Sequence, residues 1–254
     1  MINNDQIAPT YDQRYKLHDY PGIRVTLLEL IKGTEKPKVL EVGCGTGKWL
    51  RLLAQAGCDV AGLDASEEML AIARQDHEAN LRNGIAENLP WPDGSFDFVL
   101  YINALHHFTD PETAIKEPFR VLRPGGKMLS IGLDPHERIG RWYVYEFFPA
   151  ALQLDLTRFS SQAQRLVWLQ NAGFADISVC VAEHLQFNRS YAEVIRDGSL
   201  ARSFTSQLTA LSDQDYSDGI RAIQDRANAS ATFRLEVDLY FYATEARKQI
   251  KTNR

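Results

Sequence analysis

The chain has 254 residues, of which 44% are hydrophobic and 24% charged, a composition typical of a soluble globular protein. That length accommodates one α/β domain with a capping insertion. A net charge of −5 argues against a nucleic-acid-binding surface. The polar N-terminus and the lack of an apolar run of about 18 residues argue against a signal peptide and a membrane span. We therefore expect a cytoplasmic enzyme, either a monomer or a homodimer.

Two helical segments are expected between residues 7 and 32. The second repeats apolar residues with helical spacing over 23–31, and Gly33 suits a helix end. The first places several aromatic residues, Tyr11 and Tyr15 among them, so that they could share one side. These aromatic side chains could also simply pack against the rest of the domain.

A glycine-rich turn follows a predicted buried strand at 38–43 and opens a predicted helix at 47–56. Its three glycines, Gly43, Gly45 and Gly47, let the backbone turn tightly and leave no side chain between the loop and a ligand. This spacing indicates a ligand-binding loop, although an ordinary strand-to-helix turn remains open.

Two better-known glycine loops do not fit this turn. A phosphate-binding P-loop needs a glycine where Val42 stands and a Ser or Thr where Trp49 stands. A dinucleotide-binding loop needs its third glycine where Lys48 stands. An oxidoreductase that uses NAD is therefore a weaker hypothesis.

Two acidic residues accompany the loop. Glu41 precedes the glycines and suits a ligand with a positive centre rather than a pyrophosphate. Asp64 ends the second predicted strand, 58–63, where nucleoside-binding α/β folds place a carboxylate that accepts hydrogen bonds from ribose hydroxyls. Asp64 could instead cap the following helix, which Ser66 is also placed to cap.

The next elements alternate between strands and helices. We predict strands at 81–86, 96–102 and 127–133, with a helix at 110–122 that begins with a capping aspartate and a proline. Polar or chemically active residues follow two of the strand ends, Glu87 after Ala86, and the pair His106 and His107 after the next strand. The carboxyl ends of parallel strands are where open α/β sheets bind ligands.

The last hundred residues are less regular. Residues 135–160 hold five aromatic residues within seven positions, which suit an apolar pocket or a helix packed on the domain. A helix at 161–172 and a strand at 176–187 follow, and 188–231 is interpreted as a helical lid. The run 232–243 suits an antiparallel closing strand, and the tail from Arg247 is expected to fray.

Three cysteines, Cys44, Cys58 and Cys180, lie in or beside predicted strands. Their spacing matches neither a zinc site nor an iron–sulfur motif. We predict no metal site and interpret the cysteines as small buried hydrophobic residues.

Five motifs, in order and at matching spacing, resemble class I S-adenosylmethionine-dependent methyltransferases, in the group that includes the ubiquinone/menaquinone C-methyltransferases. They span 41–47, 62–66, 84–90, 96–99 and 120–126. The resemblance implies a Rossmann-like, seven-stranded, mostly parallel sheet with an antiparallel last strand, a helical N-terminal segment and an aromatic, helical lid. The resemblance is strong over residues 36–134. It implies a single domain over 1–254, in which 36–134 form the cofactor-binding core and 135–160 and 188–231 are substrate-capping insertions.

The resemblance implies S-adenosylmethionine as cofactor and S-adenosylhomocysteine as product. Met69 could also be plain core, and Glu87 could be a solvated charge. The candidate cofactor residues are Tyr11, Glu41, Gly43, Gly45, Thr46, Gly47, Asp64, Ala65, Met69, Ala86, Glu87, Asn103, Ala104 and His107.

Methyl transfer to oxygen or nitrogen also needs removal of a proton, which suits histidine near neutral pH. His106 is the first candidate base, with His107 beside it and with His184 and Tyr143 as further candidates. Either of the paired histidines could instead bond a backbone carbonyl. The candidate substrate residues are Tyr15, His106, Trp142, Tyr143, Phe147 and Arg158.

We therefore predict methyl transfer to a small, partly apolar acceptor at oxygen, nitrogen or carbon, with no nucleic-acid partner. The alternative is a protein that binds S-adenosylmethionine without transferring its methyl group, as a sensor or partner subunit. Only the first would produce S-adenosylhomocysteine.

Overall fold

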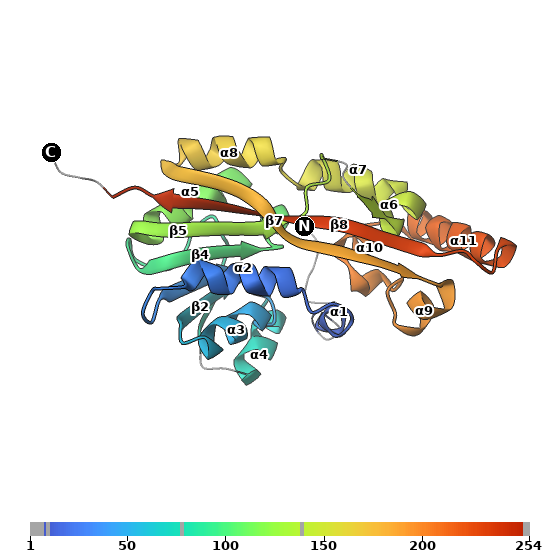
Figure 1. Ribbon diagram of the computed structural model, residues 1–254, viewed down its shortest axis with the longest axis horizontal. Helices are drawn as coiled ribbons and strands as arrows, with labels where there is room; N and C mark the ends of the chain where they lie inside the picture. Colours follow the sequence, from blue (N-terminus) through green and yellow to red (C-terminus); the bar gives the residue numbers. More distant parts are fainter. Residues whose placement is uncertain (1–7, 9–10, 77–78, 138–139, 251–254) are drawn as a thin grey trace.

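The computed structural model describes residue 8 and residues 11–76, 79–137 and 140–250. A central sheet carries helices on both faces, and a second group of helices gathers beyond one end of it (Figure 1). The strands are β1 (Lys38–Val42), β2 (Asp59–Asp64), β3 (Asn80–Asn83), β4 (Phe96–Ile102), β5 (Leu122–Gly132), β6 (Arg141–Trp142), β7 (Phe174–Arg189) and β8 (Leu235–Lys248).

The helices fall into three groups. Those of the N-terminal half are α1 (Gln13–Leu17), α2 (Pro21–Ile31), α3 (Lys48–Gln55), α4 (Glu67–Asp76) and the short 3-10 helix η2 (Leu105–His107). Those that follow are α5 (Pro111–Val121), α6 (Tyr143–Phe147), α7 (Pro149–Arg158) and α8 (Gln162–Asn171). The last are α9 (Tyr191–Arg196), η3 (Arg202–Phe204), α10 (Ser206–Thr209) and α11 (Asp213–Ala229).

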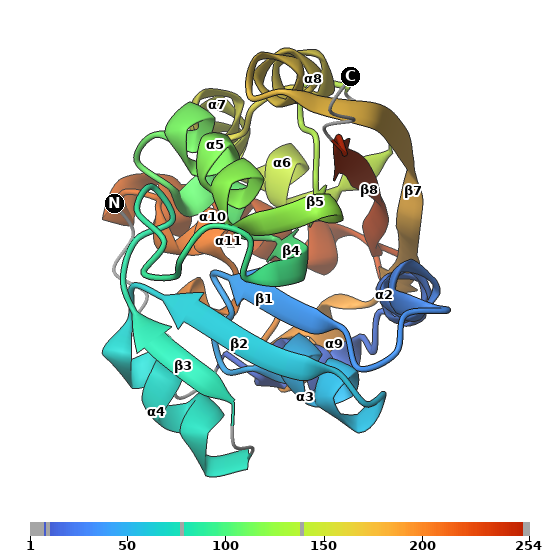
Figure 2. The same cartoon turned by 90° about the vertical axis from the view of Figure 1, so that its left-hand side faces the viewer.

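The sheet has the predicted Rossmann-like topology. Its order is β3-β2-β1-β4-β5-β8, with the first five strands parallel and β8 antiparallel to β5. Helices α5 and α8 lie on one face, and α2, α3 and α4 lie on the other (Figure 2). The fold class is confirmed, with eight strands rather than seven in the described part, because the two-residue β6 adds to the edge of β8.

Three predicted boundaries are wrong. The third strand covers 80–83 rather than 81–86, because its pairing partner β2 ends at Asp64, opposite Asn83. The fifth strand begins at Leu122 rather than at residue 127, because Leu122 pairs with Phe96 of β4. The tail does not fray at Arg247, because that residue pairs with Lys127 of β5 and Ala175 of β7.

The interpretation of all three cysteines as buried is also wrong for one of them. Cys44 is buried, Cys58 is half-buried and Cys180 is exposed on β7. Cys180 pairs with Ala243 of β8 and belongs to an exposed stretch of β7, residues 178–181.

The longest strands of the described part are β7 and β8, which form a ribbon along the molecule (Figure 1). Their pairing runs from Phe174 opposite Lys248 to Arg189 opposite Leu235, so the ribbon continues beyond the end of β5. The far half of the ribbon supports the cap, which we define as β6, α6, α7, α9, η3, α10 and α11.

Helix α2 docks on β7 through a close backbone approach. A side chain at Gly22 would place its Cβ 2.1 Å from the Ala182 carbonyl oxygen. The Glu183 carboxylate accepts from the Gly22 amide at 2.7 Å and from the Ile23 amide at 3.3 Å, so a strand 160 residues away supplies the negative charge that suits this helix N-terminus.

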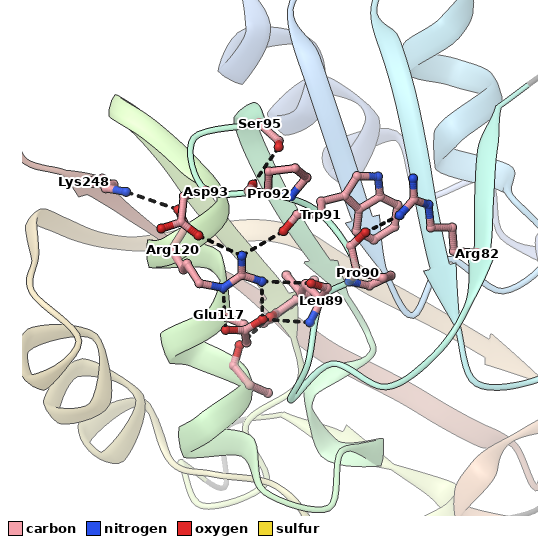
Figure 3. A network of polar contacts seen from close by, with 12 residues as sticks. Arg82, Leu89, Pro90, Trp91, Pro92, Asp93, Ser95, Glu117, Arg120 and Lys248 are labelled. Atoms are coloured by element: carbon pink, nitrogen blue, oxygen red, sulfur yellow. Dashed lines mark hydrogen bonds and ion pairs between the residues drawn. The ribbon is translucent and has the colours of Figure 1, made fainter.

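The loop before β4 is held by one arginine of α5. The Arg120 guanidinium donates to the Leu89 and Trp91 carbonyls, each at 2.8 Å, and to the Glu117 and Asp93 carboxylates (Figure 3). Glu117 in turn accepts from the Leu89 amide at 2.7 Å. This network fixes the chain that leads away from the carboxyl end of β3, where Ala86 and Glu87 lie.

Candidate functional site

A cavity of about 510 Å³ opens at the carboxyl ends of the parallel strands and continues under the cap. That volume is in the range of pockets for small molecules and cofactors. One portion, the glycine-loop portion, is lined by Gly43, Gly45, Asp64, Ala65, Met69, Ala86, Glu87, Asn103, Ala104 and His107, with Tyr11 above them. The other, the cap portion, is lined mainly by aromatic and aliphatic side chains of β7, β8 and the cap.

The glycine loop is shaped by backbone angles that favour glycine. Gly43, Gly45 and Gly47 have φ of 74°, 53° and 79°. A Cβ on Gly43 would lie 2.5 Å from the Ala104 Cβ, and one on Gly45 would lie 3.6 Å from the Tyr11 ring. The loop is therefore packed between Ala104, which follows β4, and Tyr11 of the N-terminal segment. Its first two glycines line the cavity.

Asp64 is oriented by the loop itself. Its Oδ2 accepts from the Gly45 amide at 2.7 Å, and its Oδ1 accepts from the Ser66 amide at 2.9 Å. The helix cap is Ser66, whose hydroxyl accepts from the Met69 amide at 3.2 Å. Asp64 is thus a buried carboxylate, 9% exposed, that lines the cavity in one fixed orientation.

Asn103 and Ala104 continue from β4 into the cavity wall. Asn103 has φ of 52°, a left-handed conformation that is uncommon outside glycine, and its amide donates to the Ile131 carbonyl at 2.7 Å. Strained backbone of this kind clusters at functional sites. Beyond the end of β3, Glu87 lines the cavity while its Oε1 accepts from the Asp110 amide at 2.9 Å.

The two adjacent histidines line the cavity at η2. His106 stacks on Phe159 with ring centroids 4.0 Å apart, and His107 lies against His106 at the same distance. Burial lowers the pKa of His106 well below its usual range, and burial lowers the pKa of His107 to about 4, with Arg158 and Arg14 adding to both shifts. Both rings are therefore neutral at pH 7.

The other proposed bases are placed less well. His184 is on the outer side of the ribbon, where its Nε2 lies 2.6 Å from Asp238 Oδ1, and it does not line the cavity. Tyr143 lines the cavity, but its hydroxyl donates to the Ser199 carbonyl at 3.0 Å, and burial raises its pKa well above the usual value. The Tyr143 hydroxyl therefore stays protonated at neutral pH and is already bound to a carbonyl.

Several predicted site residues lie behind the cavity wall rather than in it. The Tyr15 ring contacts Trp49 and Tyr20 edge-on and lies 3.9 Å from the Lys48 ammonium. Phe147 packs edge-on against Phe233. The residues of the prediction that are absent from the cavity lining are Tyr15, Glu41, Thr46, Gly47, Phe147 and Arg158.

Of these residues, Glu41 is buried, and Thr46 and Arg158 have other partners. Glu41 is 1% exposed, and its pKa is raised well above the usual value by burial and by Asp64. The Thr46 hydroxyl donates to Asp12 Oδ1 at 2.6 Å, which ties the N-terminal segment to the loop. Arg158 pairs with the fully buried Asp155.

Residues 40–130 match the family model of a methyltransferase domain. The demethylmenaquinone methyltransferase of Listeria welshimeri is 32% identical over 184 residues, which cover 66% of this chain and 77% of that protein. The chain belongs to the S-adenosylmethionine-dependent methyltransferases.

Other similar proteins share the activity in their names. The ubiquinone biosynthesis O-methyltransferase of Pseudomonas aeruginosa is 29% identical over 172 residues, covering 62% of this chain and 72% of that protein. A phosphoethanolamine N-methyltransferase of Haemonchus contortus, solved with S-adenosylmethionine, has a TM-score of 0.57 and 20% identity, covering 89% of this chain and 52% of that one. The last similarity shows the fold.

The glycine-loop portion of this methyltransferase fits S-adenosylmethionine. The glycine loop presents backbone rather than side chains to the cavity. The Asp64 carboxylate, which two backbone amides hold in place, also lines the cavity and is a hydrogen-bond acceptor. The methyltransferase uses S-adenosylmethionine as its cofactor. None of the helices within the described ranges is both long and apolar enough to cross a membrane.

Sequence reasoning missed much of the cap portion. Leu185 and Phe187 of β7 lie opposite Leu239 and Val237 of β8, and all four line the cavity, as does Phe241. Their alternate spacing on two paired strands was a detectable signal, because residues two apart share a face. Arg14 and Gln207 were also missed, because an isolated arginine or glutamine on a short helix has no distinguishing pattern.

Proposed function

We propose that this methyltransferase transfers a methyl group to a small, partly apolar acceptor bound in the cap portion of the cavity. One observation supports this most: the loop that fits the cofactor and the aromatic and aliphatic surface of the cap belong to one continuous cavity of about 510 Å³. The names of the quinone-pathway relatives agree with an acceptor of this kind.

The cofactor supplies a methyl group already activated on a sulfonium centre. The protein's residues then have to align the acceptor and exclude water, a contribution that can reach roughly 7–11 kcal/mol. We assign cofactor binding to the glycine-loop portion, with Asp64 as acceptor for the ribose hydroxyls. Phe159, which stacks on His106, and the facing β7–β8 residues form the apolar wall that excludes water.

His106 is our candidate for contacting the acceptor. The ring lies in the cavity wall, and neither imidazole of the histidine pair bonds to another side chain or carbonyl within the described residues. A neutral ring can accept a hydrogen bond or a proton from an acceptor hydroxyl. Its lowered pKa makes it a weak base, so it suits an acceptor that gives up its proton readily.

A thermal melt with S-adenosylmethionine, S-adenosylhomocysteine and NADH in separate samples tests the cofactor site. Ligand at about 100 times its Kd stabilises the folded protein by roughly 2.7 kcal/mol. We expect both sulfur ligands, and not NADH, to raise the Tm. No rise with either sulfur ligand would contradict the assignment of the glycine-loop portion.

A substitution tests the acceptor portion separately. Leu239→Trp fills the cap portion, so we expect S-adenosylhomocysteine to bind unchanged while turnover of small aromatic acceptors, measured as S-adenosylhomocysteine formed, is lost. Val179→Trp is the control, because that side chain is exposed on β7 outside the cavity. Turnover that survives Leu239→Trp, or turnover only with protein or RNA, would contradict a small acceptor under the cap.

A further inference from the structure

The charges that line the cavity are divided unevenly. Both carboxylates among the described lining residues, Asp64 and Glu87, lie in the glycine-loop portion. The cap portion has no carboxylate among its described residues, and its titratable rings, His18 and His106, are neutral because burial lowers their pKa values. A cationic acceptor would therefore find no counter-charge there.

The one formal cation among the described lining residues is Arg14 of α1. This short helix lies below the ribbon, between the α3–α4 side of the molecule and the cap (Figure 1). Arg14 stands between Tyr11, whose ring lies over Gly45, and His18, whose ring stacks on Phe187 at 4.5 Å. Arg14 is thus placed where the glycine-loop portion meets the cap portion.

The Arg14 guanidinium is held in position but not neutralised. Its Nε donates to the Tyr11 carbonyl at 3.1 Å, and its Cζ lies 3.8 Å from the centroid of the Tyr11 ring. Within the described residues it forms no ion pair, and its two terminal amino groups donate to no carbonyl or carboxylate. A guanidinium offers a planar pair of donors that matches carboxylate and other anionic oxygen groups.

We propose that Arg14 selects an acceptor whose reacting group is an oxygen acid, a phenol, enol or carboxylic acid bound as its anion where the two portions meet. This inference rests on the proposed function. It deepens that function, because it disfavours a protonated amine as acceptor: Arg14 would repel the ammonium, and no carboxylate of the described cap portion would attract it.

An anionic acceptor also suits the weak bases of this cavity. The anionic oxygen already holds the electron pair for the new bond to the methyl group. The S–CH3 bond breaks with its electron pair left on sulfur, so the cation and the anion become two neutral groups and O-methylation leaves no proton to be removed. Methylation at a ring carbon conjugated with that oxygen would leave one proton, on that carbon, to be lost. Water excluded by the aromatic wall strengthens the Arg14–anion attraction.

Three probes with the same nitrophenyl ring test this selection on the complex with S-adenosylhomocysteine. They are 4-nitrophenol, which ionises near neutral pH, 4-nitroaniline, which stays neutral, and 4-nitrobenzylamine, which is a cation. We expect the phenolate to bind most tightly and the cation least. We also expect the pKa of the bound phenol, followed by its absorbance, to fall below its value in solution.

Variants of Arg14 complete the test. Arg14→Gln should weaken phenolate binding about tenfold and restore the phenol's solution pKa, since about that factor attends a hydrogen bond to a charged group. Arg14→Lys keeps the charge and should keep part of the preference. Arg24→Gln is the control, because Arg24 is exposed on α2 away from the cavity and should change nothing.

Three outcomes would overturn the inference. If the protein binds S-adenosylhomocysteine but shows no preference for the phenolate, this inference fails and the proposed function stands. The second outcome is that Arg14→Gln weakens the binding of S-adenosylhomocysteine but leaves the binding of the phenolate unchanged. If the binding of 5′-methylthioadenosine, which lacks the carboxylate of the cofactor, is also unchanged, Arg14 binds the cofactor carboxylate instead of the acceptor. If the wild-type protein does not bind S-adenosylhomocysteine at all, the proposed function fails and this inference fails with it.

Discussion

At the scale of single residues, Asp64 combines two kinds of contact. Its carboxylate oxygens accept from the Gly45 and Ser66 amides, and the residue lines the cavity. The backbone amides orient the group before a ligand arrives. A carboxylate that is already oriented loses little entropy when it binds ribose hydroxyls.

Asp64→Ala should therefore weaken S-adenosylhomocysteine binding by roughly 1.5–3 kcal/mol, the range for hydrogen bonds to a charged group. Isothermal titration calorimetry measures the change. Asp59→Ala is the matched control on the same strand, because Asp59 forms only a surface ion pair with Lys38 at 3.8 Å. Equal affinity in the folded Asp64→Ala variant would sink the ribose assignment.

The buried histidines make stability depend on pH. His18 and His107 have pKa values of about 4, lowered mainly by burial, and that of His106 is also lowered, whereas an unfolded histidine titrates near 6.5. Between pH 6.5 and 4 the unfolded chain binds protons that the folded chain does not, so the free energy of unfolding falls as the pH falls. Above pH 6.5 this contribution is fully present.

Urea unfolding at a series of pH values measures this slope. We expect His107→Gln to flatten it, because one of the buried titrating groups is gone. The same slope in the variant as in the wild type would mean that the imidazole is not held neutral by burial.

At the scale of elements, the loop between β3 and β4 depends on Arg120 of α5. The guanidinium reaches two carbonyls and two carboxylates at once (Figure 3). Arg120→Lys keeps the charge but loses the fork of donors, so we expect unfolding to become about 1–3 kcal/mol easier. Loss of the same network should also loosen the segment that carries Ala86 and Glu87.

Chemical denaturation tests this prediction, with Arg123→Lys as the matched control. Arg123 forms an ion pair with Asp97 at 2.8 Å and is 44% exposed, so its replacement should cost less than about 1 kcal/mol. Equal losses in the two variants would show that the Arg120 network adds nothing beyond a surface ion pair.

At the scale of the whole molecule, one face of the sheet and the cap share a hydrophobic cluster. It includes Leu50 of α3 and Leu100 of β4 together with Phe148, Leu208 and Ile223 of the cap and its connections. Continuous burial of this kind favours a single cooperative transition. We accordingly predict that the chain unfolds as a single domain, which calorimetry can test.

Gly219→Ala probes this coupling. The new Cβ would lie 2.2 Å from the Phe148 ring, so α11 would be forced away from α6 at a cost of about 1–3 kcal/mol. We expect one calorimetric transition at a lower Tm. Two transitions, with only one of them shifted, would contradict a single cooperative unit.

The parts that the sequence could predict are those governed by local rules. The glycine loop and the strand order follow from backbone angles and a motif series within 36–134, and both lie as expected relative to Asp64. The ends of β3 and β5 could not be placed, because they depend on pairing with strands that are distant in the sequence.

The residues of the site were also predictable only where they lie next to the sequence motifs. Residues next to the motifs line the cavity, whereas Tyr15, Phe147 and Arg158 do not, because aromatic and charged residues near a site also serve as its packing. The contribution of β7 and β8 was missed because their alternate spacing shows that the apolar residues share a face, whereas tertiary pairing decides that this face meets the cap.

Strand β8 has a consequence for synthesis. It lies between β5 and β7 and also pairs with β6, so the centre of the sheet is completed by residues 235–248. A ribosome makes β5 and β7 long before this strand, and in the nascent chain each of them has an open edge. Such edges invite wrong pairing. The nascent chain thus exposes these edges until the strand emerges, and a chain that ends before residue 235 would lack the strand that joins β5 to β6 and β7.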